Sequence, residues 1–326
     1  MISSSDRDPV DRPFLLRTDF PGGSLRSRAV SRTLRCTVKP IIALVMRMPD
    51  RRWPFHLVDW LGRPLTSARG VTRAAVALPN CAAILTKPVE IRDERYIVYL
   101  HGGAFLVGGN HLHRQLTARI AADFGAEVLA VTYRKMPAHS VAVSIADSIE
   151  GYRYALDQGA RPENITIMGD SAGGYLALMT AIELRRQGLP QPAAVVAMSP
   201  LTDWDLPPRP TSACAVFPRE MRSAFRDFAV NAGQGTVPES PARCDLTGLP
   251  PVLIQASTTE TVCPDAELMA ERLADHGVSC ELQLWADEVH VFQAAASVTP
   301  EAASAVAEIG RFLDRTVGAK AIDRTA

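Results

Sequence analysis

The chain has 326 residues, of which 47% are hydrophobic and 21% are charged, and its 35 basic and 35 acidic residues give a formal net charge of zero. This composition is typical of an ordinary globular protein and excludes a largely disordered chain. Zero net charge, without a Lys/Arg-rich run interleaved with aromatic residues, argues against nucleic acid as a partner.

The six cysteines have no CxxC or other metal-like spacing, so we expect reduced thiols and neither a metal nor an organic cofactor. The N-terminus carries acidic residues and lacks the apolar core of a signal peptide. The longest apolar run, IIALVM at 41–46, is far shorter than the roughly 20 residues that span a bilayer. These features predict a soluble, cytoplasmic protein.

The first 60 residues are more basic than the rest, with eleven Lys/Arg against six Asp. Such a segment can make weak peripheral contact with anionic lipid or can form an ordinary solvated face, and the sequence leaves both interpretations open. Residues 1 to about 65 have a helical and loop-like pattern. Its apolar positions include Ile41, Ile42, Leu44, Val45 and Met48.

From about residue 71, apolar runs of strand length alternate with amphipathic helical patterns. The strand-like runs lie at 95–100, 127–133, 165–170, 193–199 and 251–257. Continuously apolar strands are buried on both faces, as in a parallel sheet. Between them, helical stripes end at Gly125 and Gly159, a further helix spans 172–187, and Thr299-Pro300-Glu301 begins the last one. This alternation predicts an α/β protein with a mostly parallel sheet covered by helices.

Residues 201–245 are rich in proline and interrupt the alternation. In an open α/β sheet, ligands bind beyond the C-terminal ends of the strands. Insertions at that edge commonly form a lid. We therefore predict that 1–65 and 201–245 form a cap over a core made of 66–200 and 246–318, with a C-terminal tail at 319–326.

The segment IMGDSAGG (167–174) contains a G-x-S-x-G pattern between a predicted strand and a predicted helix. The serine of such a turn has strained backbone angles, so its neighbours must have almost no side chain. The turn lifts the Ser171 hydroxyl above the sheet. It also leaves the Ala172 N–H at a helix N-terminus, where backbone donors favour negative charge. The pattern predicts a serine nucleophile rather than an ordinary Gly/Ser turn.

The segment YLHGGAFLVGG (99–109) follows another buried strand, so Gly102 and Gly103 present main-chain N–H groups near the same sheet edge. The tetrahedral intermediate of ester cleavage carries a negative oxygen that needs preorganised donors, and losing one donor typically costs ~3–4 kcal/mol. Gly102, Gly103 and Ala172 together would supply three donors. We predict that these residues form an oxyanion hole.

The HGGAF motif at 101–105, upstream of GDSAGG at 169–174, resembles the hormone-sensitive-lipase-like family of α/β-hydrolases, which are carboxylesterases and lipases. The resemblance covers roughly residues 70–316 and includes VTYRKMPAHS and DLTGLPPVLIQAS. It implies an α/β-hydrolase fold with a helical cap, and hydrolysis of short- to medium-chain acyl esters. The sequence departs from the family at Ala104, where a third glycine is common, and at Ala138 and Ser140, which replace Glu and Pro.

One histidine fits the position of a general base. His290, in ADEVHVFQ, follows the strand-like run CELQLWA and completes the chain order of serine, acid and histidine. Of the other six histidines, His101 is expected to anchor the oxyanion loop, with His139 as its neighbour. The remaining four are expected at the surface.

The segment QASTTETVCPDAE (255–267) offers three carboxylates for the third role, Glu260, Asp265 and Glu267. The acid must lie at the end of the preceding strand to accept the imidazole N–H. Glu260 lies in that turn, whereas Asp265 falls in the first turn of a helix, where an acid interacts with the helix dipole. The resemblance agrees, since the family carries Asp or Glu at the turn position. We choose Glu260 and keep Asp265 as the alternative.

These residues lead to the hypothesis of a serine carboxylesterase acting on a small-molecule ester through a Ser-His-Glu triad. The candidates for substrate contact are Phe105, Asp170, Trp204, Leu206, Phe217 and Phe292. An amidase, a deacetylase or a lactone hydrolase with the same triad stays open, as does a non-catalytic ligand-binding protein on a hydrolase scaffold. A homodimer is also compatible with the sequence.

Overall fold

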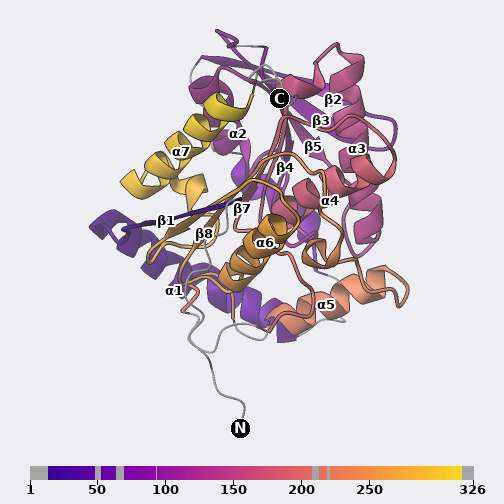
Figure 1. Ribbon diagram of the computed structural model, residues 1–326. Helices are drawn as coiled ribbons and strands as arrows, with labels where there is room; N and C mark the ends of the chain where they lie inside the picture. The colour runs from indigo at the N-terminus through magenta and orange to yellow at the C-terminus, as the bar shows by residue number, and fades with distance from the viewer. Residues whose placement is uncertain are drawn as a thin grey trace.

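The computed structural model describes residues 14–47, 53–63, 70–92, 94–207, 213–218 and 221–317 (Figure 1). Its strands are β1 (Leu15–Phe20), β2 (Val71–Ala77), β3 (Ala82–Pro88), β4 (Tyr96–Leu100), β5 (Glu127–Thr132), β6 (Ile165–Asp170), β7 (Ala194–Met198), β8 (Val252–Ser257) and β9 (Cys280–Trp285). Its α-helices are α1 (Leu25–Arg47), α2 (Arg114–Phe124), α3 (Val141–Asp157), α4 (Ala172–Arg186), α5 (Met221–Ala232), α6 (Cys263–Asp275) and α7 (Pro300–Thr316). Short 3-10 turns include η1 (Phe55–Leu57), η2 (Asp59–Gly62) and η5 (Phe292–Ala295).

The nine strands form one sheet in the order β1-β9-β8-β7-β6-β4-β5-β3-β2. The central strands pair in parallel, whereas β3 is antiparallel to both β5 and β2. Every residue of β4, β6, β7 and β8 is buried, because helices cover both faces of the middle of the sheet. The predicted mostly parallel, helix-covered sheet is confirmed.

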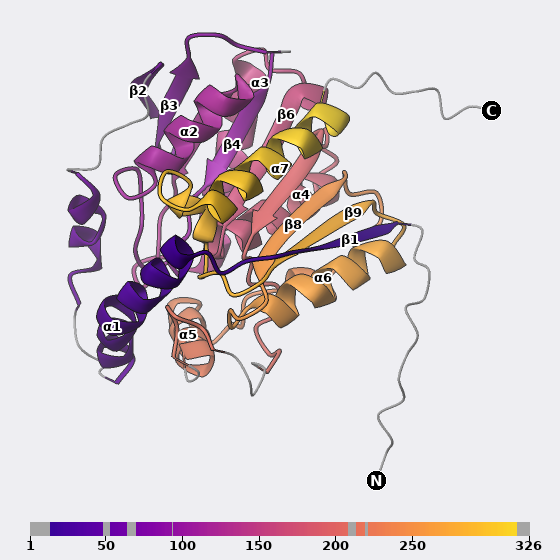
Figure 2. The ribbon, with the colours of Figure 1, turned by 90° about the vertical axis from the view of Figure 1, so that its left-hand side faces the viewer.

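Each face of the sheet has its own hydrophobic core. On one face, α2 and α7 contribute Ile120, Phe124, Ile309 and Phe312 to a cluster with the outward side chains of the central strands. On the other face, α3, α4 and α6 pack in the same way. Figure 2 shows α2 and α7 in front of the sheet, with α4 behind it. The two layers fix the central strands, and therefore the loops at their C-terminal ends.

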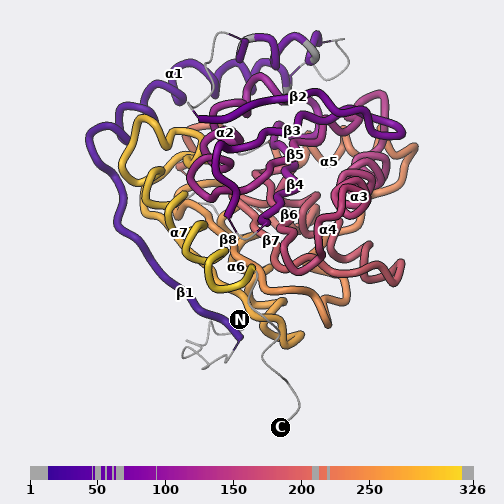
Figure 3. Tube along the Cα trace, turned by 90° about the horizontal axis from the view of Figure 1, so that it is seen from above, coloured from indigo at the N-terminus to yellow at the C-terminus, as the bar shows by residue number. Residues whose placement is uncertain are grey.

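The helical and loop-like pattern predicted for residues 1–65 is wrong for Leu15–Phe20. This segment is strand β1, which pairs in parallel with β9 in a register from Leu15 opposite Cys280 to Phe20 opposite Trp285. The Phe20 ring stacks on the Trp285 ring with centroids 4.1 Å apart. Figure 3 shows β1 at the edge of the sheet, leading into α1.

The two segments predicted to form a cap contact each other. Helices α1 and α5 lie at the same end of the molecule (Figure 2). Arg35 Nη2 of α1 donates to the Ala213 carbonyl at 2.9 Å, and Lys39 Nζ donates to the Cys214 carbonyl at 2.8 Å. The cap boundaries stay predictions, and the predicted tail at 319–326 lies outside the described residues. None of the helices in the described ranges has the length and apolarity required to cross a bilayer.

Candidate active site

Ser171 sits between β6 and α4 with φ 52° and ψ −116°, a strained backbone conformation that typically costs ~1–3 kcal/mol. Its N–H donates to the Met198 carbonyl at 2.7 Å. A side chain on Gly169 would place Cβ 2.2 Å from the Gly173 oxygen, and one on Gly173 would place it 1.9 Å from the Leu100 oxygen. Both glycines are therefore required by the close backbone packing that holds the serine above the sheet.

The structure brings Ser171, His290 and Glu260 into one hydrogen-bonded chain. Ser171 Oγ lies 2.8 Å from His290 Nε2, and His290 Nδ1 lies 2.5 Å from Glu260 Oε2. The second carboxylate oxygen of Glu260 accepts the Ser257 N–H at 2.8 Å, which fixes the carboxylate in the turn after β8. Glu260 is 2% exposed and His290 is 9% exposed, so the hydrogen bond between them is shielded from water. A carboxylate at Nδ1 leaves Nε2 as the acceptor for the serine proton.

The predicted oxyanion loop follows β4 and faces this serine turn. Among the described residues, the main-chain N–H groups of Gly102, Gly103 and Ala172 donate to no other group. Gly103 has φ 118°, and a Cβ there would lie 2.3 Å from the Val107 oxygen, so only glycine fits. Its carbonyl accepts the N–H groups of Leu106 and Val107, which closes the loop on itself. The free donors can therefore serve a ligand.

Two buried aromatic residues hold this loop from below. His101 Nδ1 lies 2.7 Å from the Gly102 carbonyl, to which it donates, and the Tyr133 hydroxyl donates to the His101 carbonyl at 2.6 Å. The rings of His101 and Tyr133 stack with centroids 4.4 Å apart. Burial lowers the pKa of His101 well below its ordinary value, so the ring stays neutral. These contacts suit the anchoring role expected for His101.

Asp170, a candidate for substrate contact, instead supports the oxyanion loop. Its carboxylate accepts the Tyr99 hydroxyl at 2.6 Å and lies 3.3 Å from His113 Nε2. A Cβ on Gly102 would lie 2.2 Å from the same carboxylate. Burial opposes ionisation, but the charge and hydrogen bond of His113 outweigh it and lower the pKa of Asp170, while Asp170 raises the pKa of His113. His113 was expected at the surface, and its side chain is only 15% exposed.

Asp265, the alternative acid, lies elsewhere. Its carboxylate pairs with Arg222 of α5 at 2.6 and 2.8 Å and accepts the N–H groups of Thr202 and Asp203 at 2.9 and 3.1 Å. The Asp265 side chain is fully buried and that of Arg222 is 9% exposed. Asp265 therefore joins α5 to α6, and its hydrogen bonds do not include His290.

A pocket with about 470 Å³ of empty space, its open mouth included, adjoins the serine. Its walls come from the oxyanion loop, α5 and the turn before α6. They include Ala104, Leu201, Phe217, Met221, Arg222, Phe225, Thr261 and Val262. The Phe217 ring meets the His290 ring edge-on, with centroids 4.6 Å apart. The walls are predominantly apolar, which suits an acyl chain.

Three of the predicted contact residues are placed in the core instead. Phe105 has φ 53°, which turns its ring inward against Trp204 and Phe225. Phe292 packs on Trp285 at the opposite face of the sheet. Of these aromatic residues only Phe225 lines the described pocket, and Phe105 and Trp204 pack against Phe225. Phe217 is the predicted aromatic candidate that reaches the pocket.

A contact that the sequence pattern did not indicate connects α1 to the histidine loop, the segment after β9 that carries His290. The Ser27 hydroxyl donates to Glu288 Oε2 at 2.7 Å, two residues before His290. The Glu288 carbonyl accepts the Ser257 and Thr259 hydroxyls at 2.6 and 3.1 Å. Burial raises the pKa of the Glu288 carboxyl. The sequence pattern does not indicate this contact, because Ser27 and Glu288 are 261 residues apart.

The mostly parallel sheet and the turn at Ser171 after β6 are features of an α/β-hydrolase fold, and comparison with known proteins specifies the family. Residues 97–294 match the family described as having the alpha/beta hydrolase fold, and the chain belongs to that family. An esterase from the bacterial hormone-sensitive lipase family has a similar structure, with a TM-score of 0.80 and 28% identity. That similarity covers 91% of this chain and 100% of the other.

Two curated relatives are esterases of Mycobacterium tuberculosis. Esterase LipU is 36% identical over 296 residues, which cover 86% of this chain and 99% of LipU. Carboxylesterase/phospholipase LipF is 33% identical over 311 residues, which cover 90% of this chain and 82% of LipF. The protein is a carboxylic ester hydrolase of the hormone-sensitive-lipase-like family.

Proposed function

We propose that the protein hydrolyses short- to medium-chain acyl esters through a Ser171-His290-Glu260 triad and an acyl-enzyme intermediate. The observation that carries the proposal is the hydrogen-bonded chain from Glu260 through His290 to Ser171, at 2.5 and 2.8 Å. The serine also adjoins the apolar pocket.

In the first half of the reaction, Ser171 Oγ attacks the ester carbonyl while His290 Nε2 takes the hydroxyl proton. Glu260 keeps the Nδ1 proton in place and stabilises the imidazolium that forms. The carbonyl oxygen becomes an oxyanion, which the N–H groups of Gly102, Gly103 and Ala172 bind. His290 then returns its proton to the alcohol as the C–O bond breaks, leaving the acyl group on Ser171.

In the second half, water enters and gives a proton to His290 while its oxygen attacks the acyl-enzyme. The second oxyanion occupies the same donors. Collapse releases the carboxylic acid as the proton moves from His290 to Ser171 Oγ.

The walls of the pocket support short to medium acyl chains. Leu201, Phe225 and Val262 give it an apolar lining, and the rings of Phe105 and Trp204 pack against Phe225. A chain that grows toward these buried rings would have to displace them, at a cost of typically about 1–3 kcal/mol. Turnover should therefore fall as the acyl chain lengthens.

The test is steady-state hydrolysis of p-nitrophenyl esters from acetate to palmitate by the wild type, Ser171→Ala and Glu260→Gln. We expect turnover at short chains that is lost in Ser171→Ala and reduced about 10⁴-fold in Glu260→Gln. Glu267→Gln is the matched control, since it removes a carboxylate from the same segment and should keep full activity. Turnover that survives in Ser171→Ala would reject the triad, and matched p-nitroanilides would reveal an amidase.

A further inference from the structure

Helix α1 is the most cationic of the described helices and strands. It carries Arg26, Arg28, Arg32, Arg35, Lys39 and Arg47 and contains no acidic residue. The whole chain balances 35 basic with 35 acidic residues, so the rest of the protein has a surplus of six carboxylates. Within the described part of the chain, no carboxylate lies within ion-pair distance of an α1 cation. Ion pairs within the described residues therefore leave the positive charge of α1 unbalanced.

This helix also exposes apolar side chains to solvent. Ile41 is 62% exposed and Leu44, three residues later and hence on the same side of the helix, is 50% exposed. Leu25 at the N-terminal end is 83% exposed. The five arginines of α1 are exposed as well. Over its 23 residues, about 35 Å, the helix exposes guanidinium groups, and Arg47 lies three residues after Leu44, on the side of the aliphatic pair.

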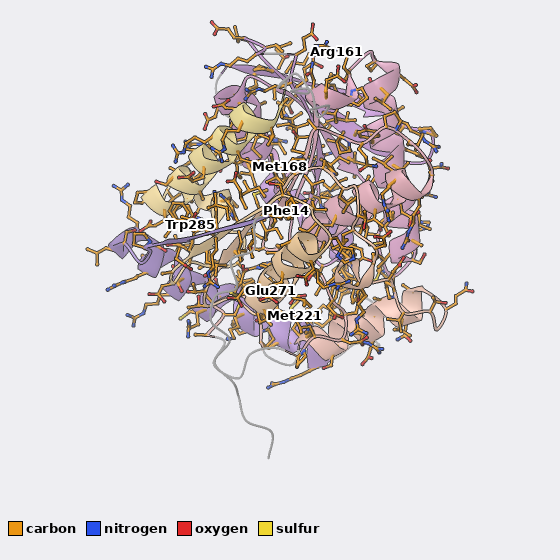
Figure 4. The ribbon with its side chains drawn as sticks, viewed as in Figure 1. Phe14, Arg161, Met168, Met221, Glu271 and Trp285 are labelled. Carbon is orange, nitrogen blue, oxygen red and sulfur yellow. The ribbon has the colours of Figure 1, made fainter. Side chains whose placement is uncertain are left out.

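The position of α1 ties this surface to the catalytic end of the molecule. Arg35 and Lys39 hold the 213–214 backbone. Three residues further on, Phe217 lines the pocket and contacts His290. In Figure 4, Met221 of the pocket wall lies at the α1 end, and Arg161 lies at the opposite end. Helix α1 therefore contacts the segment 213–217, whose last residue forms part of the pocket wall.

We propose that α1 docks the protein on an anionic lipid surface and so places the pocket next to esters held in that surface. Cations attract the negatively charged headgroups, and Ile41 and Leu44 can enter the boundary between headgroups and acyl chains. A second copy of the chain is disfavoured as the occupant, because two α1 faces would oppose cation to cation. A nucleic acid would match the charge but would leave the aliphatic side chains without apolar contacts.

Vesicle co-sedimentation tests this proposal without any ester turnover, so its outcome is independent of the proposed function. We expect the wild type to bind phosphatidylcholine vesicles containing phosphatidylglycerol at about 0.05 M salt and to dissociate at about 0.5 M, where charge is strongly screened. Vesicles of phosphatidylcholine alone should not retain it. The triple variant Arg26→Glu/Arg32→Glu/Arg47→Glu should bind at least about 100-fold more weakly, since each cation near such a surface contributes substantially.

The matched control is Arg153→Glu/Arg161→Glu/Arg311→Glu, which makes the same change of net charge with exposed arginines outside α1. It should bind like the wild type, and both triple variants should hydrolyse soluble esters normally. Ile41→Gln/Leu44→Gln keeps every charge and should still weaken binding.

Equal losses in the two triple variants would reduce the effect to net charge and overturn the proposal. Absence of wild-type binding to the anionic vesicles would also overturn it. So would sedimentation of the free protein as a dimer that Ile41→Gln/Leu44→Gln dissociates, because α1 would then be a contact between copies.

Discussion

The two carboxylates Glu260 and Asp265 are five residues apart, and their substitution should produce opposite phenotypes. Asp265 accepts two hydrogen bonds from Arg222 and two from backbone N–H groups, and its side chain is fully buried. In Asp265→Asn the backbone donors can keep one oxygen, but Arg222 loses its counter-charge. Removing one partner of a buried ion pair costs about 3–5 kcal/mol, so we expect the free energy of unfolding to fall by that amount.

Glu260→Gln should leave stability almost unchanged. Its amide oxygen can still accept the Ser257 N–H, and its NH₂ group can donate to His290 Nδ1. That donation forces the wrong tautomer on the imidazole, so kcat should fall about 10⁴-fold. Asp265→Asn should instead raise KM while kcat is maintained, because α5, which Arg222 anchors, forms a wall of the pocket.

The assay combines urea unfolding, followed by circular dichroism, with p-nitrophenyl butyrate kinetics on both variants at a temperature where each is folded. The reasoning would be refuted by the reversed pattern, in which Asp265→Asn keeps its stability and loses kcat while Glu260→Gln stays active. In that case, the acid of the triad would be Asp265.

Two further predictions concern the oxyanion loop. In Gly102→Ala the new Cβ would lie 2.2 Å from the Asp170 carboxylate, so the loop must move and kcat should drop about 10²–10³-fold in folded enzyme; unchanged kcat would argue against these donors. Burial lowers the pKa of His101 in the folded protein. The contribution of the neutral ring to the free energy of unfolding is therefore fully present above the unfolded pKa of about 6.5. It is lost as the pH falls below that value, by at most about 1.4 kcal/mol per pH unit. His101→Asn, whose amide can still donate to the Gly102 carbonyl, should flatten that part of the profile measured by urea unfolding, and parallel profiles would contradict the assignment.

The central strands were predictable because their physical requirement is simple. Segments such as 165–170 and 251–257 are apolar at nearly every position, and only a strand buried on both faces satisfies that pattern. Strand β1 was not predicted, because its sequence LLRTDF mixes charged and apolar residues. An edge strand tolerates such a mixture because one of its sides faces solvent. The segment is a strand because it pairs with β9, its only partner in the described sheet.

The convergence of Ser171, His290 and Glu260 could be predicted from chain order and turn sterics, but the lining of the pocket could not. Which way a loop side chain points depends on backbone angles that sequence patterns do not encode. Phe105 illustrates this, because its positive φ turns the ring into the core. The role of Asp265 likewise depends on Arg222, a residue 43 positions away on a different helix.

The pairing of β1 with β9 has a consequence for the order in which the protein matures. β1 precedes the other described strands, and at about 5–20 residues per second its partner β9 is synthesised on the order of 10–50 s later. Until then, the bond between Ser27 and Glu288 beside the histidine loop cannot form. The nascent chain can thus build most of its parallel sheet before the loop that carries His290 has been synthesised. Esterase activity during synthesis would report the moment at which β9 and the loop after it join β1.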